Sequence, residues 1–328
     1  MSETHIHDVI IIGSGPAGYT AGIYTGRANL KPLILAGMLE PGGELMKTTA
    51  VENYPGFPEG IDGPDLMENF QAQAERFGAE ILFEDATKLD LEGPVKKVTA
   101  TDGEIYLARS VIISTGSAHR KLGLPNEEAL SGRGLSYCAT CDGSFFEDQE
   151  VAVVGGGDSA VEEALFLTKF ATTVHLIVRG DKLRASKIMA DRVLAHGRVR
   201  VRYESEIAAI ASCAMANGAG EAVVGIKTVD RSGNIDHVPV SGVFIAIGND
   251  PRTSLVAGQL ELDRFSGCIK VMGRSSQTSQ RGVFAAGDVI DPMYRQAITA
   301  AASGCVAAQD VEHYLAESAP AHLEAASA

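Results

Sequence analysis

Cys138 and Cys141 are separated by two residues in the stretch SYCATCDGSFF, and Asp142 directly follows the second cysteine. A structural zinc site needs four ligands, and the chain has neither a second CxxC pair nor histidines at HxxxH spacing. A structural disulfide closing so small a loop would remove little entropy from the unfolded chain. The pair therefore favours a redox role, in which a helix beginning near Cys138 would stabilise a thiolate. Asp142 adds a group that could transfer a proton beside the second sulfur.

The composition of the chain limits the compartments in which this dithiol could work and the partners that it could bind. The 328-residue chain has a formal net charge of −14, which argues against nucleic acid and anionic membranes, because both bind basic surfaces. No apolar run reaches the roughly 18 residues of a membrane span, and the start MSETHIHD lacks the features of a signal peptide. Five cysteines are too few and too unevenly spaced for a disulfide framework. We expect a reducing cytoplasm and no metal.

A redox dithiol needs an electron source, and a nucleotide motif lies at the N-terminus. The apolar run Val9 to Ile12 is typical of a buried parallel strand, and GSGPAG follows it as a GxGxxG turn. Gly13 permits the tight turn, Gly15 lets a pyrophosphate approach the backbone, and Gly18 lets helix and strand pack closely. No acidic residue ends the second strand, LKPLILAG; Glu40 comes a few positions late, so a ribose contact cannot be assigned there.

The same motif occurs a second time. An apolar strand from Val151 to Val154 leads into GGGDSA, a GxGxxA variant that begins at Gly155. The strand that follows ends at Arg179, with Arg184 five residues later, where an NAD-preferring site would place an acid. Basic residues at this point fit the 2′-phosphate of NADPH. The alternative is that both arginines are solvated surface residues.

The repeat extends beyond the glycine motifs. Residues 98–116 and 226–248 share one plan: a strand, a turn with Asp and Gly, a second strand, and an apolar run that ends in Gly. If the segment after the second repeat returns to the first domain, the second domain is an insertion. The expected fold class is α/β, with two Rossmann-like three-layer dinucleotide-binding domains, the second inserted into the first. The predicted boundaries are 1–117 with 248–328, and 118–247.

Taken together, the motifs resemble those of the low-molecular-weight thioredoxin reductases of bacteria, plants and fungi. The segments that carry the resemblance lie within residues 5–316 and are, in order, GSGPAG, GGELMKTTAVENYPGF, ISTGS, SYCATCDG, GGGDSAVEEA and GVFAAGDVIDPMYRQA. A CxxC pair between the two glycine motifs distinguishes this family from other flavoprotein disulfide reductases, which carry it near the N-terminus.

The resemblance implies an FAD site and an NADPH site. For FAD it implies Gly13, Ser14, Gly15, Pro16, Ala17 and Gly18 at the pyrophosphate, Gly43, Glu44, Leu45 and Asn53 on the flavin side, Asp288 at the ribityl chain, and Arg295, Gln296 and Ala297 at the isoalloxazine. For NADPH it implies Gly155, Gly157, Asp158, Ser159 and Ala160 at the pyrophosphate, Arg179 and Arg184 at the 2′-phosphate, and Gly248 near the nicotinamide.

Two segments depart from the family pattern. Glu44 stands where the family often has Gln. The phosphate-binding segment, which usually reads HRRDxxRA, here reads VRGDKLRA, so that Gly180 replaces one arginine and Val178 replaces the histidine. Two arginines can still hold a phosphate, and we therefore expect NADPH to be favoured, with weaker discrimination against NADH.

The implied reaction is an electron relay. Electrons pass from NADPH to FAD, from reduced FAD to the Cys138–Cys141 disulfide, and from the dithiol to thioredoxin. In the family Cys141 faces the flavin, Cys138 attacks thioredoxin, and Asp142 protonates the leaving thiolate. Family members are homodimers through their FAD domains, and the inserted domain rotates, which here predicts hinges near 117–120 and 245–250.

Three alternative functions fit parts of the pattern. An FAD-dependent dithiol oxidase of the same fold keeps the CxxC pair but loses the NADPH motif, against which GGGDSA, Arg179 and Arg184 count. The partner could also be a thioredoxin-like protein other than thioredoxin itself. A non-enzymatic redox sensor would bind nucleotide without turnover of any disulfide.

Overall fold

The structure, a computed structural model, describes residues 5–215, 218 and 220–318. It divides into two compact units. Unit 1 comprises Met1–Ala118 with Asp250–Ala328, and unit 2 comprises His119–Asn249. The crossings fall at 118/119 and 249/250, one and two residues beyond the predicted boundaries. The crossing strands β9 (Ser117–His119) and β18 (Asn249–Pro251) pair with each other as a two-stranded sheet.

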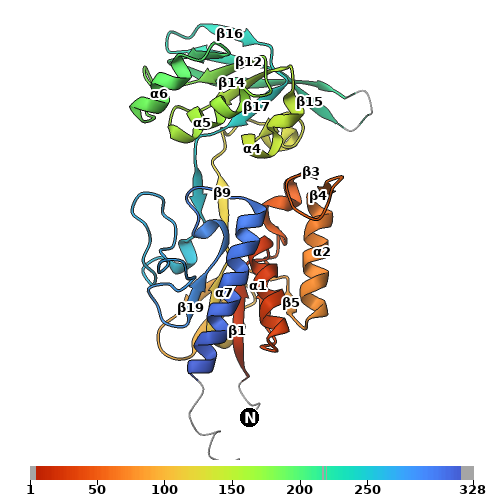
Figure 1. Ribbon diagram of the computed structural model, residues 1–328, viewed down its shortest axis with the longest axis vertical. Coiled ribbons are helices and arrows are strands. Elements are labelled where there is room, and N and C mark those ends of the chain that lie inside the picture. Colours follow the sequence, from red (N-terminus) through yellow and green to blue (C-terminus); the bar gives the residue numbers. More distant parts are fainter. Residues whose placement is uncertain (1–4, 216–217, 219, 319–328) are drawn as a thin grey trace, which may run out of the picture. The chain divides into compact units, whose positions relative to one another are not determined.

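Unit 1 is built on a seven-stranded sheet with the order β5-β2-β1-β8-β7-β6, in which β19 also pairs with β8. Figure 1 labels β1, β5 and β19 of this sheet. Strands β5, β2, β1, β8 and β19 are parallel, whereas β7 and β6 continue from β8 as an antiparallel meander. The strands are β1 (Ile6–Ile12), β2 (Leu33–Leu35), β5 (Glu80–Leu82), β6 (Ala86–Asp90), β7 (Lys96–Ala100), β8 (Ile105–Ile113) and β19 (Val283–Ala285). A short hairpin joins β3 (Ala50–Val51) to β4 (Ile61–Asp62).

Strand β1 is buried on both faces, because its residues alternate between two cores. Val9 and Ile11 pack with the helices α1 (Pro16–Arg27), α2 (Gly63–Arg76) and α7 (Ala297–Glu317). Ile10 and Ile12 face the other way, where the meander and later residues cover them. Helices α1 and α7 lie side by side over the first face (Figure 1). A continuous apolar run is what a strand with two covered faces requires.

Unit 2 repeats this plan with a five-stranded parallel sheet in the order β10-β17-β11-β12-β13. The strands are β10 (Leu135–Ser136), β11 (Glu150–Val154), β12 (Thr173–Ile177), β13 (Val199–Arg202) and β17 (Gly242–Ile245). An antiparallel sheet of β14 (Ser205–Ala214), β15 (Glu221–Asp230) and β16 (Ile235–Val238) forms a further layer. The helices are α3 (Glu127–Leu130), α4 (Ala139–Asp142), α5 (Asp158–Leu167) and α6 (Lys187–Leu194).

The central strand of unit 2 alternates in the same way as that of unit 1. Val151 and Val153 pack towards the helices, while Ala152 and Val154 pack towards the antiparallel sheet. The expected α/β class with two Rossmann-like units, the second inserted into the first, is therefore confirmed. Strand β11 begins one residue earlier than predicted, and β1 begins three residues earlier, at Ile6, because it pairs with β8 along that extra length.

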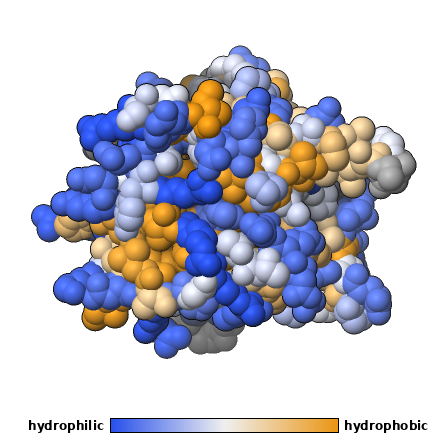
Figure 2. Space-filling view, turned by 90° about the horizontal axis from the view of Figure 1, so that it is seen from above, coloured by the Kyte–Doolittle hydropathy of each residue, from blue (hydrophilic) through white to orange (hydrophobic). Residues whose placement is uncertain are grey.

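The face of the molecule drawn in Figure 2 is predominantly hydrophilic. On the face drawn in Figure 2, hydrophilic residues surround several separate groups of apolar ones. Within the described part of the chain, none of the helices is both long and apolar enough to cross a membrane.

The close packing of α7 on α1 yields a stability prediction. A Cβ at Gly304 would lie 2.1 Å from the carbonyl oxygen of Ala17, so Gly304→Ala should force these helices apart and cost about 1–3 kcal/mol. Chemical denaturation measures the loss. The same replacement at Gly197, where no atom lies within 4 Å, is the control and should be neutral within about 0.5 kcal/mol. Equal stability of the two variants would contradict the packing argument.

Candidate redox and dinucleotide sites

The two cysteines of the CxxC pair form a disulfide at the start of α4. Their Cα atoms are 5.3 Å apart, and Cys138 is the N-cap of the helix that begins at Ala139. The backbone N–H of Cys138 donates to Ser136 Oγ at 3.0 Å, while buried Ala139 anchors the turn in the core of unit 2. The predicted helix start at Cys138 is confirmed.

Asp142 is the last residue of this helix and directly follows Cys141 in the chain. Burial raises the pKa of its carboxyl, and a hydrogen bond with Ser136 opposes that shift. A raised pKa keeps a larger fraction of the carboxyl protonated near neutral pH, which is what a proton donor to a thiolate needs. Ser136 therefore contacts both Cys138 and Asp142, a role that the sequence analysis did not assign.

The first glycine turn leaves backbone open at the N-terminus of α1. A Cβ at Gly18 would lie 1.9 Å from the carbonyl oxygen of Gly13, so helix and strand pack as closely as the motif predicts. No atom lies within 4 Å of the Cβ position of Gly15, the N-cap. A diphosphate could approach the backbone there and meet the unpaired N–H groups of the first helical turn. These residues fit a dinucleotide.

A second loop closes on this turn. Ser14 Oγ donates to the carbonyl oxygen of Ala36 at 2.6 Å and accepts the N–H of Gly42 at 2.8 Å. The Cβ position of Gly43 lies 3.5 Å from Cα of Gly15. The short 3₁₀ helix η1 (Gly43–Lys47) carries Glu44 and Leu45, so the structure brings the pyrophosphate residues and three of the flavin-side residues together.

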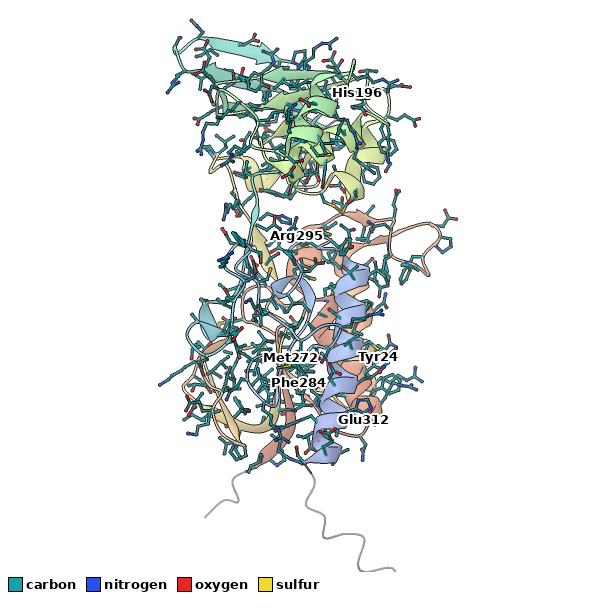
Figure 3. The ribbon with its side chains drawn as sticks, turned by 60° about the vertical axis from the view of Figure 1, so that its left-hand side comes forward. Tyr24, His196, Met272, Phe284, Arg295 and Glu312 are labelled. Atoms are coloured by element: carbon teal, nitrogen blue, oxygen red, sulfur yellow. A yellow bond between two sulfur atoms is a disulfide. The ribbon has the colours of Figure 1, made fainter. Side chains whose placement is uncertain are left out.

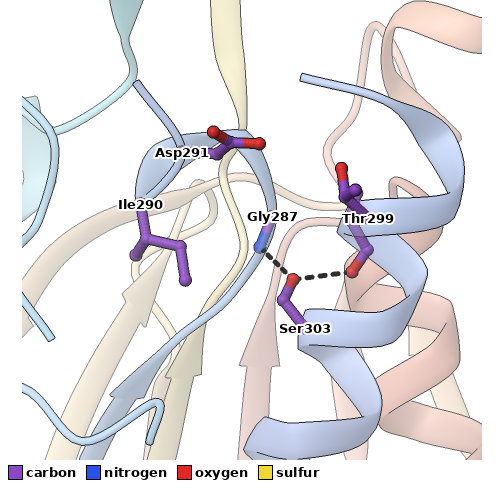
Figure 4. Close-up of a pocket in the computed structure, with 6 residues that line it drawn as sticks. Gly287, Ile290, Asp291, Thr299 and Ser303 are labelled. Atoms are coloured by element: carbon purple, nitrogen blue, oxygen red, sulfur yellow. Dashed lines mark hydrogen bonds between the residues drawn. The ribbon is translucent and has the colours of Figure 1, made fainter. Parts of the chain in front are cut away.

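Asp288 lies in the 3₁₀ helix η4 (Gly287–Val289), which packs on α1: a Cβ at Gly287 would lie 2.9 Å from Cβ of Ala17. Burial raises the pKa of Asp288 to about 6, and the charge of Asp291 adds to the shift, which Arg295 opposes. A cavity of about 210 Å³ adjoins it, lined by Gly287, Ile290, Asp291, Thr299, Ala300 and Ser303 (Figure 4). Ser303 Oγ accepts the N–H of Gly287 at 2.8 Å and so joins η4 to α7. A partly buried carboxyl with a pKa of about 6 suits hydrogen bonding to a neutral hydroxyl.

The remaining predicted flavin-side residues meet before α7. Arg295 has a positive φ of 48°, and Asp291 Oδ2 accepts its N–H at 2.8 Å (Figure 3 labels Arg295). Gln296 caps α7, which begins at Ala297, through a capping box with Thr299. Asn53 Nδ2 donates to Gln296 Oε1 at 3.4 Å. Residues 243 positions apart in sequence therefore lie at one place in unit 1.

The glycine turn of unit 2 has the same construction. A Cβ at Gly155 would lie 2.4 Å from the carbonyl oxygen of Ala246, and its φ of 146° suits glycine. No atom lies within 4 Å of the Cβ position of Gly157, the N-cap of α5, which continues through Asp158, Ser159 and Ala160. This turn also leaves backbone open for a diphosphate at a helix N-terminus.

The basic segment after β12 folds over this second turn. The N–H groups of Arg184 and Ala185 donate to the carbonyl oxygen of Gly156 at 2.7 and 3.2 Å. Ser186 N–H donates to Asp158 Oδ1 at 2.8 Å, so this carboxylate already holds the segment in place. Sequence reasoning assigned Asp158 to the coenzyme and missed Ser186, because no local pattern marks a contact across 28 positions.

The two predicted phosphate-binding arginines differ in their surroundings. Arg179 Nε lies 3.9 Å from Glu206 Oε1, and both side chains are well exposed. Among the described residues no carboxylate forms an ion pair with Arg184. Gly248, near the end of unit 2, contacts the start of this unit: its carbonyl oxygen accepts the N–H of Arg120 at 3.0 Å.

A metal site has no candidate in the described ranges, where no group of three or more His, Cys, Asp or Glu residues could hold an ion.

Comparisons with known proteins identify the class. Residues 7–304 match the family described as pyridine nucleotide-disulphide oxidoreductase. The chain belongs to this family. It is 54% identical over 312 residues to the thioredoxin reductase of Streptomyces coelicolor, covering 95% of this chain and 94% of that protein. It is 55% identical over 313 residues to that of Mycolicibacterium smegmatis, covering 95% and 97%.

Solved structures lead to the same class of protein. The thioredoxin reductase from Streptococcus pyogenes superimposes with a TM-score of 0.88 at 40% identity, covering 96% of this chain and all of that one. Within the family the chain groups with the thioredoxin reductases of low molecular weight. The resemblance noted from the motifs is confirmed, and the Cys138–Cys141 pair fits the redox-active disulfide of such an enzyme.

The pKa of Asp288 leads to a pH-dependent prediction. The folded-state pKa of Asp288, about 6, lies above the ordinary 3.8, so ionisation of this carboxyl lowers the free energy of unfolding. This loss of stability is absent below the unfolded-state pKa, grows as the pH rises from there to about 6, and is complete at higher pH. In the FAD-free protein, Asp288→Asn should raise the free energy of unfolding by up to about 3 kcal/mol near pH 8, and by little near pH 4. Urea unfolding at both pH values measures this.

The control for this experiment has the opposite sign. Backbone hydrogen bonds from Ser266 and Phe265 lower the pKa of Asp263, so its stabilising effect is present at high pH and lost as pH falls. Asp263→Asn should therefore destabilise the protein near pH 8 and less so in acid. An Asp288→Asn effect independent of pH would refute the assignment of a raised pKa.

Proposed function

We propose that the enzyme is an NADPH-dependent flavoprotein that reduces thioredoxin through the Cys138–Cys141 disulfide. The observation that carries the proposal is the disulfide itself, at the start of a helix and followed by a carboxyl of raised pKa, in a chain with two open glycine turns. When bound, FAD supplies two-electron transfer between a nicotinamide and a disulfide.

The chemistry of the dithiol follows from its position. Reduced Cys138, at the helix N-cap, is the thiolate that attacks the thioredoxin disulfide and forms a mixed disulfide. Cys141 then attacks Cys138, the mixed disulfide breaks, and thioredoxin leaves with both of its sulfurs reduced. Asp142 donates a proton to the departing thiolate. The enzyme disulfide is re-formed and the partner disulfide is reduced, so two electrons balance.

Thioredoxin as partner is supported by a relative that carries both proteins. The chain is 51% identical over 315 residues to the bifunctional thioredoxin reductase/thioredoxin of Mycobacterium leprae, covering 96% of this chain and 67% of that protein. In that relative the reductase is joined to a thioredoxin. A cytoplasmic location, where such a dithiol stays reduced, completes the proposal.

A homodimer through unit 1 is also part of the proposal. Tyr24 on α1 and Ile298 and Val306 on α7 are large apolar side chains that remain exposed in the single chain. The Tyr24 hydroxyl hydrogen-bonds with the thiol of Cys305 on α7, which raises the pKa of this tyrosine (Figure 3 labels Tyr24). A second copy that covered these side chains would remove apolar surface from water. Light scattering measures the mass in solution.

The roles of the two sulfurs are separable by substitution. Cys141→Ser should leave Cys138 free to trap a stable mixed disulfide with thioredoxin, because the sulfur that resolves it is gone. Cys138→Ser should trap none. Both variants should keep FAD and lose thioredoxin reduction, measured as NADPH oxidation in the presence of thioredoxin; turnover near that of wild type in either would rule out the dithiol relay.

Coenzyme preference tests the basic segment. Arg179 and Arg184 should favour NADPH about 100-fold in kcat/KM, since contacts of arginine with phosphate contribute roughly 1.5–3 kcal/mol each before screening. Alanine at either position should raise KM for NADPH and leave NADH nearly unchanged. Gly180→Arg should sharpen the preference. Equal use of both coenzymes by the wild type, or equal weakening of both in the alanine variants, would show that these arginines do not bind the phosphate.

A further inference from the structure

Arg252 lies between two carboxylates of the loop that closes on the first glycine turn. Its Nη2 atom is 3.0 Å from Glu44 Oε1 and 3.5 Å from Glu40 Oε2. Lys47 forms the other ion pair of this loop, with its Nζ 2.5 Å from Glu40 Oε1. All four residues belong to unit 1. Two negative and two positive charges therefore balance within the cluster.

Hydrogen bonds also hold the backbone of Arg252 in place. Its N–H donates to the carbonyl oxygen of Gly116 at 3.0 Å, and its own carbonyl oxygen accepts Thr115 Oγ1 at 2.7 Å. Gly116 and Thr115 follow strand β8, which pairs with β1. The backbone that carries this guanidinium is therefore held by residues directly next to the central sheet.

The acidic loop is in direct contact with the turn that would receive a diphosphate. Gly42 N–H donates to Ser14 Oγ, and the Cβ position of Gly43 lies 3.5 Å from Cα of Gly15. The first turn of α1 contains no acidic side chain, whereas the loop that contacts it carries Glu40 and Glu44. The charge of Glu44 is also felt at Asp288, where it helps to raise the pKa.

These charges matter because a dinucleotide brings negative charge of its own. A diphosphate at the N-terminus of α1 is favoured by the helix dipole and by free N–H groups. Unneutralised carboxylates on the adjacent loop would oppose it, and repulsion of this kind weakens with ionic strength. A cation that neutralises them removes the penalty and keeps the loop in place.

We propose that Arg252 is a positioning residue for the bound dinucleotide, which neutralises Glu44 and Glu40 and fixes their loop against the diphosphate-binding turn. The inference rests on the proposed FAD cofactor. It also accounts for the tolerance of a carboxylate at position 44, where the chain departs from the family pattern, since Glu44 has its compensating cation at 3.0 Å.

The test is the dissociation constant of FAD, measured by recovery of FAD fluorescence as the full-length holoprotein is diluted. Arg252→Ala should raise this constant about fivefold to tenfold at low ionic strength, and the penalty should shrink as salt screens the carboxylates. Arg252→Lys, which keeps the charge, should recover most of the affinity. In a Glu44→Gln background the effect of Arg252→Ala should be clearly smaller, because one of the two carboxylates is gone.

Arg109 provides the matched control. Its Nη1 atom lies 3.0 Å from Asp8 Oδ1 in the same unit, with exposure close to that of Arg252, and neither residue belongs to the proposed FAD site. Arg109→Ala should leave the FAD dissociation constant unchanged. Far-ultraviolet circular dichroism of each variant verifies that the fold is retained.

The outcomes separate this inference from the proposed function. An unchanged dissociation constant in Arg252→Ala, or a loss that neither lysine nor salt reverses, overturns the electrostatic role of Arg252 while leaving FAD binding intact. A wild-type protein that carries no flavin contradicts the proposed function itself. A salt-dependent loss that lysine restores and Glu44→Gln reduces supports the inference.

Discussion

In the proposed function, both units depend on one constraint: a charged diphosphate must approach bare backbone at the start of a helix. It requires a buried strand that ends at a glycine turn, a helix N-terminus with unpaired N–H groups, and no side chain in the space between. Gly15 and Gly157 meet the last condition, because nothing lies within 4 Å of their Cβ positions. Gly13 and Gly155 meet the first, through carbonyl oxygens that exclude any Cβ.

Around each open turn, a different segment supplies the electrostatic complement. In unit 2 the basic segment folds back over the turn, held by the carbonyl oxygen of Gly156 and the carboxylate of Asp158. In unit 1 the adjacent loop is acidic, and Arg252 and Lys47 neutralise it. The two units therefore share the same backbone arrangement at the glycine turn but differ in charge beside it: unit 2 has a basic segment, and unit 1 has an acidic loop that cations neutralise.

The redox centre also lies at the N-terminus of a helix, here a much shorter one. Cys138 caps a helix only four residues long, and its partner sulfur lies within that helix. Partial burial raises the pKa of Asp142, which suits the proton donor of the proposed reaction, while its hydrogen bond with Ser136 limits the shift. Ser136 also accepts the N–H of Cys138, so a single hydroxyl contacts both the nucleophile and the acid of the proposed reaction.

Local pattern by itself determined much of this protein: the glycine turns, the strands before them, the CxxC pair and the repeat that implies an inserted second unit. Such features depend on neighbours in the chain, through backbone conformation and the alternation of apolar residues. Only the tertiary structure decided that Ser186 holds Asp158, that Asn53 meets Gln296, and that Arg252 neutralises Glu44 across 208 positions. These contacts join residues far apart in sequence, and their partners are selected by how the sheets and loops pack, which no local spacing records.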